Sequence, residues 1–145
     1  MEGRVLIVEP LRLVREAVVG LLSRYGYRIL SVESAAAAIL LPHRFECCVF
    51  SDTLPDSSAL SLAGWFLVEQ RIRSAIFFGT TEDVDFRLRA SNVGTFVARA
   101  EGLHRLLRAV KDSFEDRSQQ RMAASAESMS LDARTDSGLR RWHTR

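Results

Sequence analysis

The residues best placed for chemistry lie at positions 45–58, FECCVFSDTLPDSS, where an apolar run passes directly into polar residues. Ser51 and Asp52 stand at this junction, and Glu9 follows an earlier apolar run at positions 4–8. A carboxylate or a hydroxyl at such a junction could take part in chemistry at the end of a strand. Solvated loop acids are the alternative interpretation of Glu9 and Asp52, and the residue types alone leave both open.

Common nucleotide-binding, metal-binding and redox motifs are missing from the sequence. Neither G-x-G-x-x-G nor G-x-x-x-x-G-K-[ST] follows the first apolar run, which disfavours dinucleotide and P-loop chemistry. The three histidines lack the spacing of a catalytic or metal-binding set, and we expect them at the surface: His43, His104 and His143. Cys47 and Cys48 are adjacent rather than in a CxxC pair, so we expect two small buried hydrophobic residues. These absences count against an enzyme.

Length and charge describe a small protein without an obvious class of partner. The 145 residues suit one domain with a substantial core, and the formal net charge is +2. Basic and acidic residues are interspersed, so composition indicates neither nucleic-acid nor membrane binding. No apolar run approaches the ~20 residues that span a bilayer, and the N-terminus MEGRVLIVE does not resemble a secretory signal. We therefore expect a soluble cytoplasmic protein.

Strands and helices are predicted to alternate along residues 4–114. Short apolar runs predict strands at 4–8, 27–32, 45–50, 74–79 and 94–98. Helical spacing and stop signals predict helices at 11–25, 34–41, 58–73, 83–90 and 101–114. Such alternation implies right-handed crossovers and a parallel sheet between two helix layers, which is an α/β architecture.

The composition changes after Phe114. Residues 116–145 are rich in Ser, Arg, Asp and Gln, and their few apolar residues keep no period. Such a segment cannot bury enough apolar surface to fold alone. We predict a domain over 1–115 and a flexible tail or linker over 116–145, in which Trp142 is the residue that could dock on the domain or on a partner.

The ends of the predicted strands indicate where a site should form. In an open parallel sheet, functional groups gather at the carboxyl ends of the strands. The first strand is followed by Glu9, the third by Ser51 and Asp52, the fourth by Thr80 and the fifth by Arg99. We expect these residues to share one edge of the sheet.

Residues 4–114, and the start RVLIVEPLRLVREAVVGLL in particular, resemble the receiver domain of bacterial two-component response regulators. The resemblance implies a flavodoxin-like, doubly wound sheet of five parallel strands in the order 2-1-3-4-5, with five helices. It also implies a site in which two acids after the first strand and an aspartate ending the third bind a divalent ion. That aspartate accepts a phosphoryl group from a histidine kinase. A Thr or Ser after the fourth strand and a Lys after the fifth bind the phosphoryl oxygens, and a nearby aromatic residue changes position in response.

The acidic positions of this pattern are only partly filled. Pro10 stands in place of the second acid, so no metal is expected, and Glu9 and Asp52 remain weak candidate ligands. Counting back four residues from Pro55 places the phosphoacceptor position at Ser51. Asp52 comes one residue late, and a shift of one residue along a strand turns a side chain to the other face.

The remaining positions are also mixed. Thr80 matches the switch hydroxyl and Phe96 the aromatic residue, although Thr80 also fits a turn or helix cap and Phe96 also fits core packing. The lysine position carries Arg99, followed by Ala100 where the family usually has proline. Lys111, the single lysine of the chain, falls on the last predicted helix and cannot replace it.

These departures predict an atypical receiver that acts in signal transduction or transcriptional regulation through protein–protein interaction, without enzymatic activity or a cofactor. The alternative is a conventional receiver phosphorylated at Asp52 with Mg²⁺. Arg89 falls on the fourth predicted helix, and His104 and Arg108 fall on the fifth. With the fifth strand, these helices form the face that receivers use to pair. We expect that face to bind a protein partner or a second copy, and DNA binding only if an output domain is missing from the chain.

Overall fold

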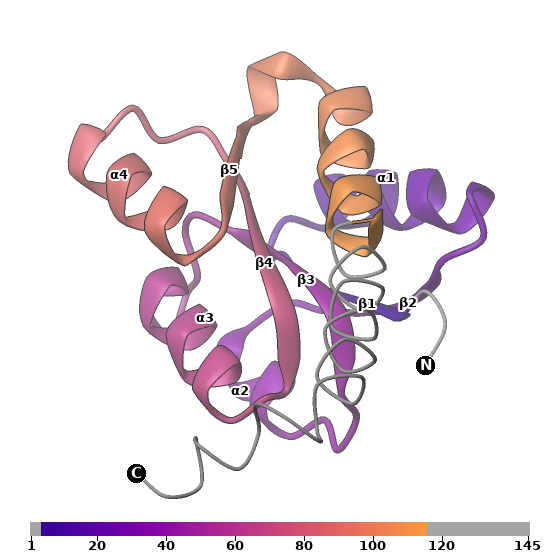
Figure 1. Cartoon of the computed structure of the whole chain (residues 1–145), viewed down its shortest axis with the longest axis horizontal. Coiled ribbons are helices and arrows are strands. Elements are labelled where there is room, and N and C mark those ends of the chain that lie inside the picture. The colour runs from indigo at the N-terminus through magenta and orange to yellow at the C-terminus, as the bar shows by residue number, and fades with distance from the viewer. Residues whose placement is uncertain (1–3, 116–145) are drawn as a thin grey trace, which may run out of the picture. The chain divides into compact units, whose positions relative to one another are not determined.

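The computed structural model describes residues 4–115, and the predicted tail at 116–145 lies outside this range. Five strands form one sheet: β1 (Arg4–Val8), β2 (Arg28–Val32), β3 (Phe45–Ser51), β4 (Ile72–Gly79) and β5 (Thr95–Ala98). The helices are α1 (Arg12–Arg24), α2 (Ala35–Ile39), α3 (Ala59–Val68) and α4 (Val84–Val93) (Figure 1). A short 3-10 helix, η1 (Arg99–Glu101), precedes a helix that begins at residue 103 and continues to residue 115.

The strand order of the sheet is β2-β1-β3-β4-β5, and every pair is parallel. This confirms the flavodoxin-like, doubly wound sheet predicted from the sequence. The order reverses between β1 and β3, and ligands of such sheets bind outside the strand ends at this point. Glu9 follows β1 and Ser51 ends β3, so these two residues stand at the reversal.

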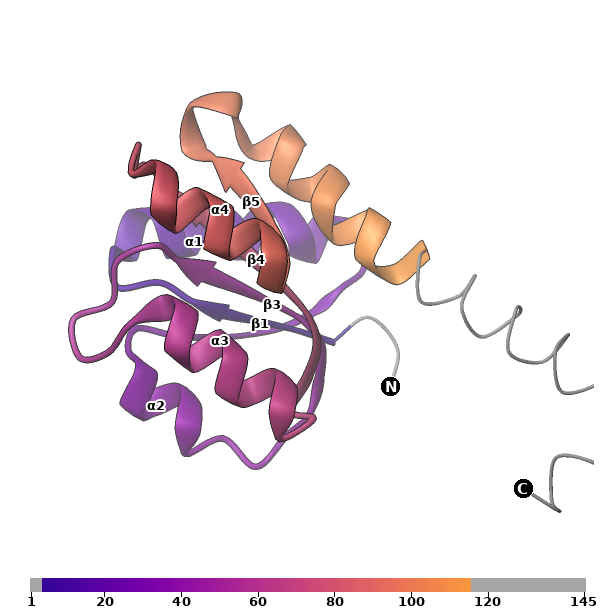
Figure 2. The same ribbon diagram turned by 60° about the vertical axis from the view of Figure 1, so that its left-hand side comes forward.

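Helices cover both faces of the sheet (Figures 1 and 2). One core lies under α1 and the helix at 103–115, and the other lies under α2, α3 and α4. All seven residues of the central strand β3 are buried, as its apolar run requires. Because side chains alternate along a strand, Cys47 enters the first core and Cys48 the second. Burial raises the pKa of Cys47 to about 12 and also raises that of Cys48 well above its ordinary value.

The helix α3 ends earlier than predicted. It was expected to reach residue 73 but stops at Val68, because the chain turns through Gln70 at a φ of 59°. The Arg71 N–H donates to the Phe66 carbonyl at 2.8 Å, and the Gln70 N–H donates to the Leu67 carbonyl at 3.1 Å. These two bonds form a Schellman motif, which usually places glycine where Gln70 stands. The usual signal for the end of a helix is therefore missing from the sequence.

The last two helices also differ from the predicted boundaries. The helix α4 continues to Val93 instead of residue 90, and the Gly94 N–H then donates to the Ala90 carbonyl. The last helix begins at 103 instead of 101, because η1 occupies the intervening turn. None of the helices in the described range is long and apolar enough to cross a lipid bilayer.

Candidate functional site

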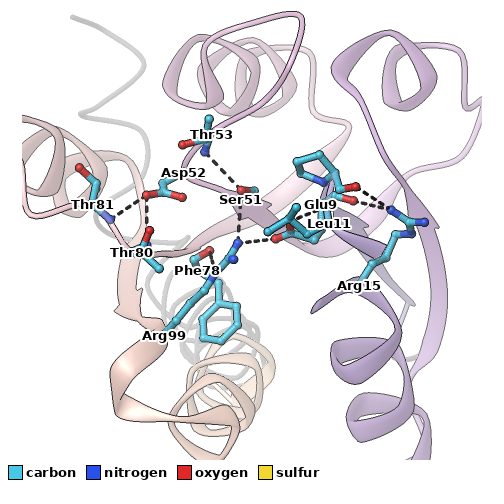
Figure 3. Close-up of polar contacts among 11 residues, drawn as sticks. Glu9, Leu11, Arg15, Ser51, Asp52, Thr53, Phe78, Thr80, Thr81 and Arg99 are labelled. Atoms are coloured by element: carbon cyan, nitrogen blue, oxygen red, sulfur yellow. Dashed lines mark hydrogen bonds and ion pairs between the residues drawn. The ribbon is translucent and has the colours of Figure 1, made fainter. Parts of the chain in front are cut away.

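The carboxyl edge of the sheet brings together the polar residues predicted from the strand ends (Figure 3). Glu9 and Ser51 are buried, Asp52 and Arg99 are half-buried, and Thr80 is exposed. They come from β1, β3, β4 and β5 or the turns that follow these strands. The edge therefore combines two carboxylates, two hydroxyls and one guanidinium.

Arg99 lies at the centre of this group. Its Nη2 donates to Glu9 Oε1 at 2.5 Å and to Ser51 Oγ at 3.3 Å. Its Nε donates to the Phe78 carbonyl at 3.2 Å, and the guanidinium lies over the Phe78 ring. The side chain thereby connects the ends of β1, β3 and β4 to η1, with its cation between Glu9 and Ser51 (Figure 3).

Glu9 is held from several sides. Its second carboxylate oxygen accepts a hydrogen bond from the Leu11 N–H at 3.0 Å, and its backbone carbonyl accepts one from Arg15 Nη1 at 2.8 Å. Burial raises the pKa of Glu9 above its ordinary value, while the Leu11 N–H and the Arg99 cation oppose that rise. Each oxygen of the Glu9 carboxylate thus already has a donor within the protein.

Asp52 points away from Arg99 and toward the loop that follows β4 (Figure 3). A single oxygen, Oδ2, accepts hydrogen bonds from the Thr80 N–H at 3.1 Å and the Thr81 N–H at 2.8 Å. Gly79 makes room for it, since a Cβ there would lie 2.2 Å from Asp52 Cγ. Ser51, one residue earlier, instead lies beside Arg99. The two candidate acceptor positions therefore take part in separate hydrogen-bond networks.

Arg87, which no sequence motif indicated, connects this loop to the fifth strand. Its Nε donates to the Thr81 carbonyl at 2.9 Å, and its guanidinium lies 4.8 Å from the centre of the Phe96 ring. Phe96 also contacts Phe86 edge-to-face, and it is half-buried. The Phe96 ring is thereby connected to the loop that Asp52 holds.

The donor set does not fit a divalent cation. An octahedral Mg²⁺ site needs several free oxygen ligands at fixed positions. Pro10 contributes no side-chain oxygen, both oxygens of Glu9 accept hydrogen bonds, and Asp52 Oδ2 faces two backbone amides. Within residues 4–115, no group of three or more His, Cys, Asp or Glu side chains could hold a metal ion.

Solved structures resemble this chain, although no family model and no curated protein matches it. The response regulator TrrA from Thermotoga maritima, in complex with Mg²⁺ and BeF, superposes with a TM-score of 0.68 at 19% identity, covering 77% of this chain and 98% of that chain. The receiver domain dimer of NtrC4, activated by beryllofluoride, gives 0.71 at 19%, with coverages of 79% and 98%. The receiver domain of an HD domain-containing protein from Pseudomonas fluorescens gives 0.73 at 18%, with 83% and 92%. The chain has the receiver fold.

The three residues predicted to lie on an interaction face of this receiver fold are exposed. They are Arg89 on α4 and His104 and Arg108 on the helix at 103–115. Arg89 Nε lies 3.6 Å from Asp85 Oδ2, a surface pair one helical turn away. At these sequence identities the likeness establishes the receiver fold, and a shared fold does not by itself fix function.

Proposed function

We propose that this chain is a receiver-like signalling module that acts through protein–protein interaction, without catalysis and without aspartyl phosphorylation. The observation that carries the proposal is the Arg99 guanidinium between Glu9 and Ser51. Among its structural neighbours, TrrA was solved with Mg²⁺ and BeF. Here the protein itself supplies a permanent positive charge, which replaces a bound cation next to Glu9.

The two residues at the acceptor position support the same proposal. Ser51, at the phosphoacceptor-equivalent position, carries a hydroxyl and cannot form an aspartyl phosphate. Asp52 carries the carboxylate, but its Oδ2 already accepts the N–H groups of Thr80 and Thr81. These bonds fix the direction of the carboxylate, so a phosphoryl group would have to be placed on Oδ1, which lies against Gly79. Asp52 therefore holds in place the loop that a phosphoryl group would otherwise reorganise.

The same contacts favour one conformation of the proposed interaction face. A ligand shifts a conformational equilibrium only by binding one state more tightly than another. In this chain the bonds from Asp52 to Thr81 and from Arg87 to both Thr81 and Phe96 are built in. The proposed face consists of α4, β5 and the helix at 103–115, with a protein or a second copy as its partner.

The proposal also includes the division of the chain into a domain and a tail. Residues 1–115 form the receiver-like domain, and residues 116–145 serve as a tail or linker. DNA binding would require an output domain outside this chain. The protein acts in the cytoplasm.

Treatment with a small phosphodonor and Mg²⁺ tests the proposal. We expect no gain of mass by intact-protein mass spectrometry and no change in association by light scattering. Charge reversal at Arg89 or Arg108 is expected to weaken association under both conditions. A gain of one phosphoryl group that is lost in Asp52→Asn, but kept in the control Asp56→Asn, would instead establish a conventional receiver phosphorylated at Asp52.

A further inference from the structure

A patch of exposed apolar side chains lies at the opposite edge of the sheet from the Glu9–Arg99 pair. The α2–α3 patch, as we name it, consists of Ile39, Leu40, Trp65 and Val68. Leu40 is 82% exposed and Val68 is 78% exposed, which are high values for large apolar residues. The helices α2 and α3 that carry the patch lie side by side (Figure 2). Such a patch marks an interaction surface.

Arg71 joins the two halves of the patch. Its guanidinium donates to the carbonyls of Ile39 and Leu41, each at 2.9 Å, at the end of α2. The same guanidinium lies 5.4 Å from the centre of the Trp65 ring on α3. These contacts tie the end of α2 to Trp65 on α3. Tryptophan and arginine are also the residues most enriched where binding energy concentrates in protein interfaces.

The border of the patch is positively charged. Arg44 is exposed in the loop between α2 and β3, and this loop lies beside Arg71 because the Phe45 N–H donates to the Arg71 carbonyl at 2.8 Å. Glu69, at the end of α3, is the acid nearest in sequence to Arg71 and is also exposed. Glu46 and Arg73, which also lie near this loop in sequence, pair with each other at 3.8 Å. Arg44 and Arg71 against Glu69 then leave a net positive border, which complements an acidic partner.

We propose that the α2–α3 patch docks an amphipathic helix of a partner protein, with an apolar stripe on Trp65 and Val68 and acidic side chains toward Arg44 and Arg71. The positive border disfavours the basic segment LRRWHTR at 139–145 of this chain as the occupant. A fluid lipid surface would not need a guanidinium fixed by two carbonyls and a ring. This second face is formed by α2 and α3 rather than by α4 and β5, so it goes beyond the proposed function.

Two synthetic amphipathic peptides of about five helical turns, with the same leucine stripe and either Glu or Lys flanks, probe the patch in the full chain. Trp142→Phe leaves Trp65 as the sole tryptophan, so its fluorescence reports binding beside calorimetry. We expect the Glu-flanked peptide to bind about tenfold more tightly than the Lys-flanked peptide. Val68→Ser and Arg44→Glu should each weaken binding of the Glu-flanked peptide about tenfold. The matched exposed positions on α1, in Leu13→Ser and Arg24→Glu, should leave binding unchanged.

Several results would overturn this assignment. They are no binding of the Glu-flanked peptide at millimolar concentration, equal affinity for both peptides, or no effect of Val68→Ser. Binding of Trp65 to phosphatidylglycerol vesicles would assign the patch to a lipid surface instead. Self-association that is lost in Val68→Ser would assign it to a second copy of the chain. None of these results bears on whether Asp52 accepts a phosphoryl group, so the two proposals fail separately.

Discussion

The Asp52 carboxylate packs directly on Gly79, at a distance that leaves no space for a Cβ atom. This contact brings Oδ2 to the N–H groups of Thr80 and Thr81, the two residues that follow Gly79. The end of β3 is thereby bonded to the loop between β4 and α4. The position of that loop depends on the missing side chain at residue 79 as much as on the carboxylate.

Gly79→Ala is therefore expected to displace Asp52 and to lower the free energy of unfolding by about 1–3 kcal/mol, the cost of losing its hydrogen bonds. Urea denaturation measures this change, and amide hydrogen exchange at Thr80 and Thr81 should accelerate. Gly20→Ala is the control, because a Cβ there meets no atom within 4 Å. Gly20 lies inside a helix, so its replacement should stabilise the protein by about 0.5–1 kcal/mol. Equal effects of the two variants would contradict the role of Gly79.

Arg99→Ala removes the cation that pairs with the buried carboxylate of Glu9. Removing one partner of such a pair leaves a buried charge, and we expect a loss of about 2–4 kcal/mol in the free energy of unfolding. The double variant with Glu9→Gln should recover part of this loss, because it removes the unpaired charge. Strictly additive effects of the two substitutions in urea denaturation would show that the residues do not interact.

The raised pKa of Glu9 should be visible in how the free energy of unfolding changes with pH. Burial raises its folded-state pKa above the ordinary value of 4.5, so the folded protein binds this proton more tightly than the unfolded chain. The contribution of Glu9 to the free energy of unfolding therefore falls as pH rises from about 4.5 through the folded-state pKa. Glu9→Gln should flatten that decline in urea denaturation series.

Asp56 provides a control of opposite sign for this series. Its carboxylate accepts the N–H groups of Ala35 and Ala36, which lowers its pKa below the ordinary value of 3.8. Its stabilising contribution is present above 3.8 and is lost as pH falls through the folded-state value. Asp56→Asn should therefore change the profile only at the acid end. A Glu9→Gln profile parallel to that of the unmodified protein above pH 4.5 would contradict the burial argument.

Gln70 and Gly26 form a natural comparison at the ends of α3 and α1. Both have positive φ, 59° for Gln70 and 88° for Gly26. A side chain is strained in this region, so Gln70→Gly should stabilise the protein by about 0.5–1 kcal/mol. Gly26→Gln should destabilise it by about 1 kcal/mol or more. Thermal and urea denaturation measure the stability of both variants. A Gln70→Gly variant less stable than the unmodified protein would show that the Gln70 side chain makes compensating contacts.

The sequence was most informative where a pattern is local. The apolar runs of β1 and β3 predict buried strands without any tertiary information. The pairing of strands is not encoded in periodicity, and the correct order came from the resemblance to receivers. The end of α3 was missed because Gln70 occupies a position where glycine is the usual signal.

For the site, strand ends identified Glu9 and Arg99 as neighbours although 90 residues separate them, because the carboxyl ends of parallel strands share one edge. The contacts of Asp52 could not be predicted, since they depend on loop geometry and on the space above Gly79. Arg87 and Arg89 look alike in the sequence. Their side chains leave α4 in different directions, so that Arg87 contacts Phe96 and Arg89 is exposed.

The adjacent thiols of Cys47 and Cys48 provide the protein with two internal reporters of local opening. One faces the layer of α1 and the helix at 103–115, and the other faces the layer of α2, α3 and α4. Neither thiol should react with an alkylating reagent until its own layer separates from the sheet, because burial keeps both protonated. Peptide-resolved alkylation rates would therefore show which helix layer detaches first, without any introduced label.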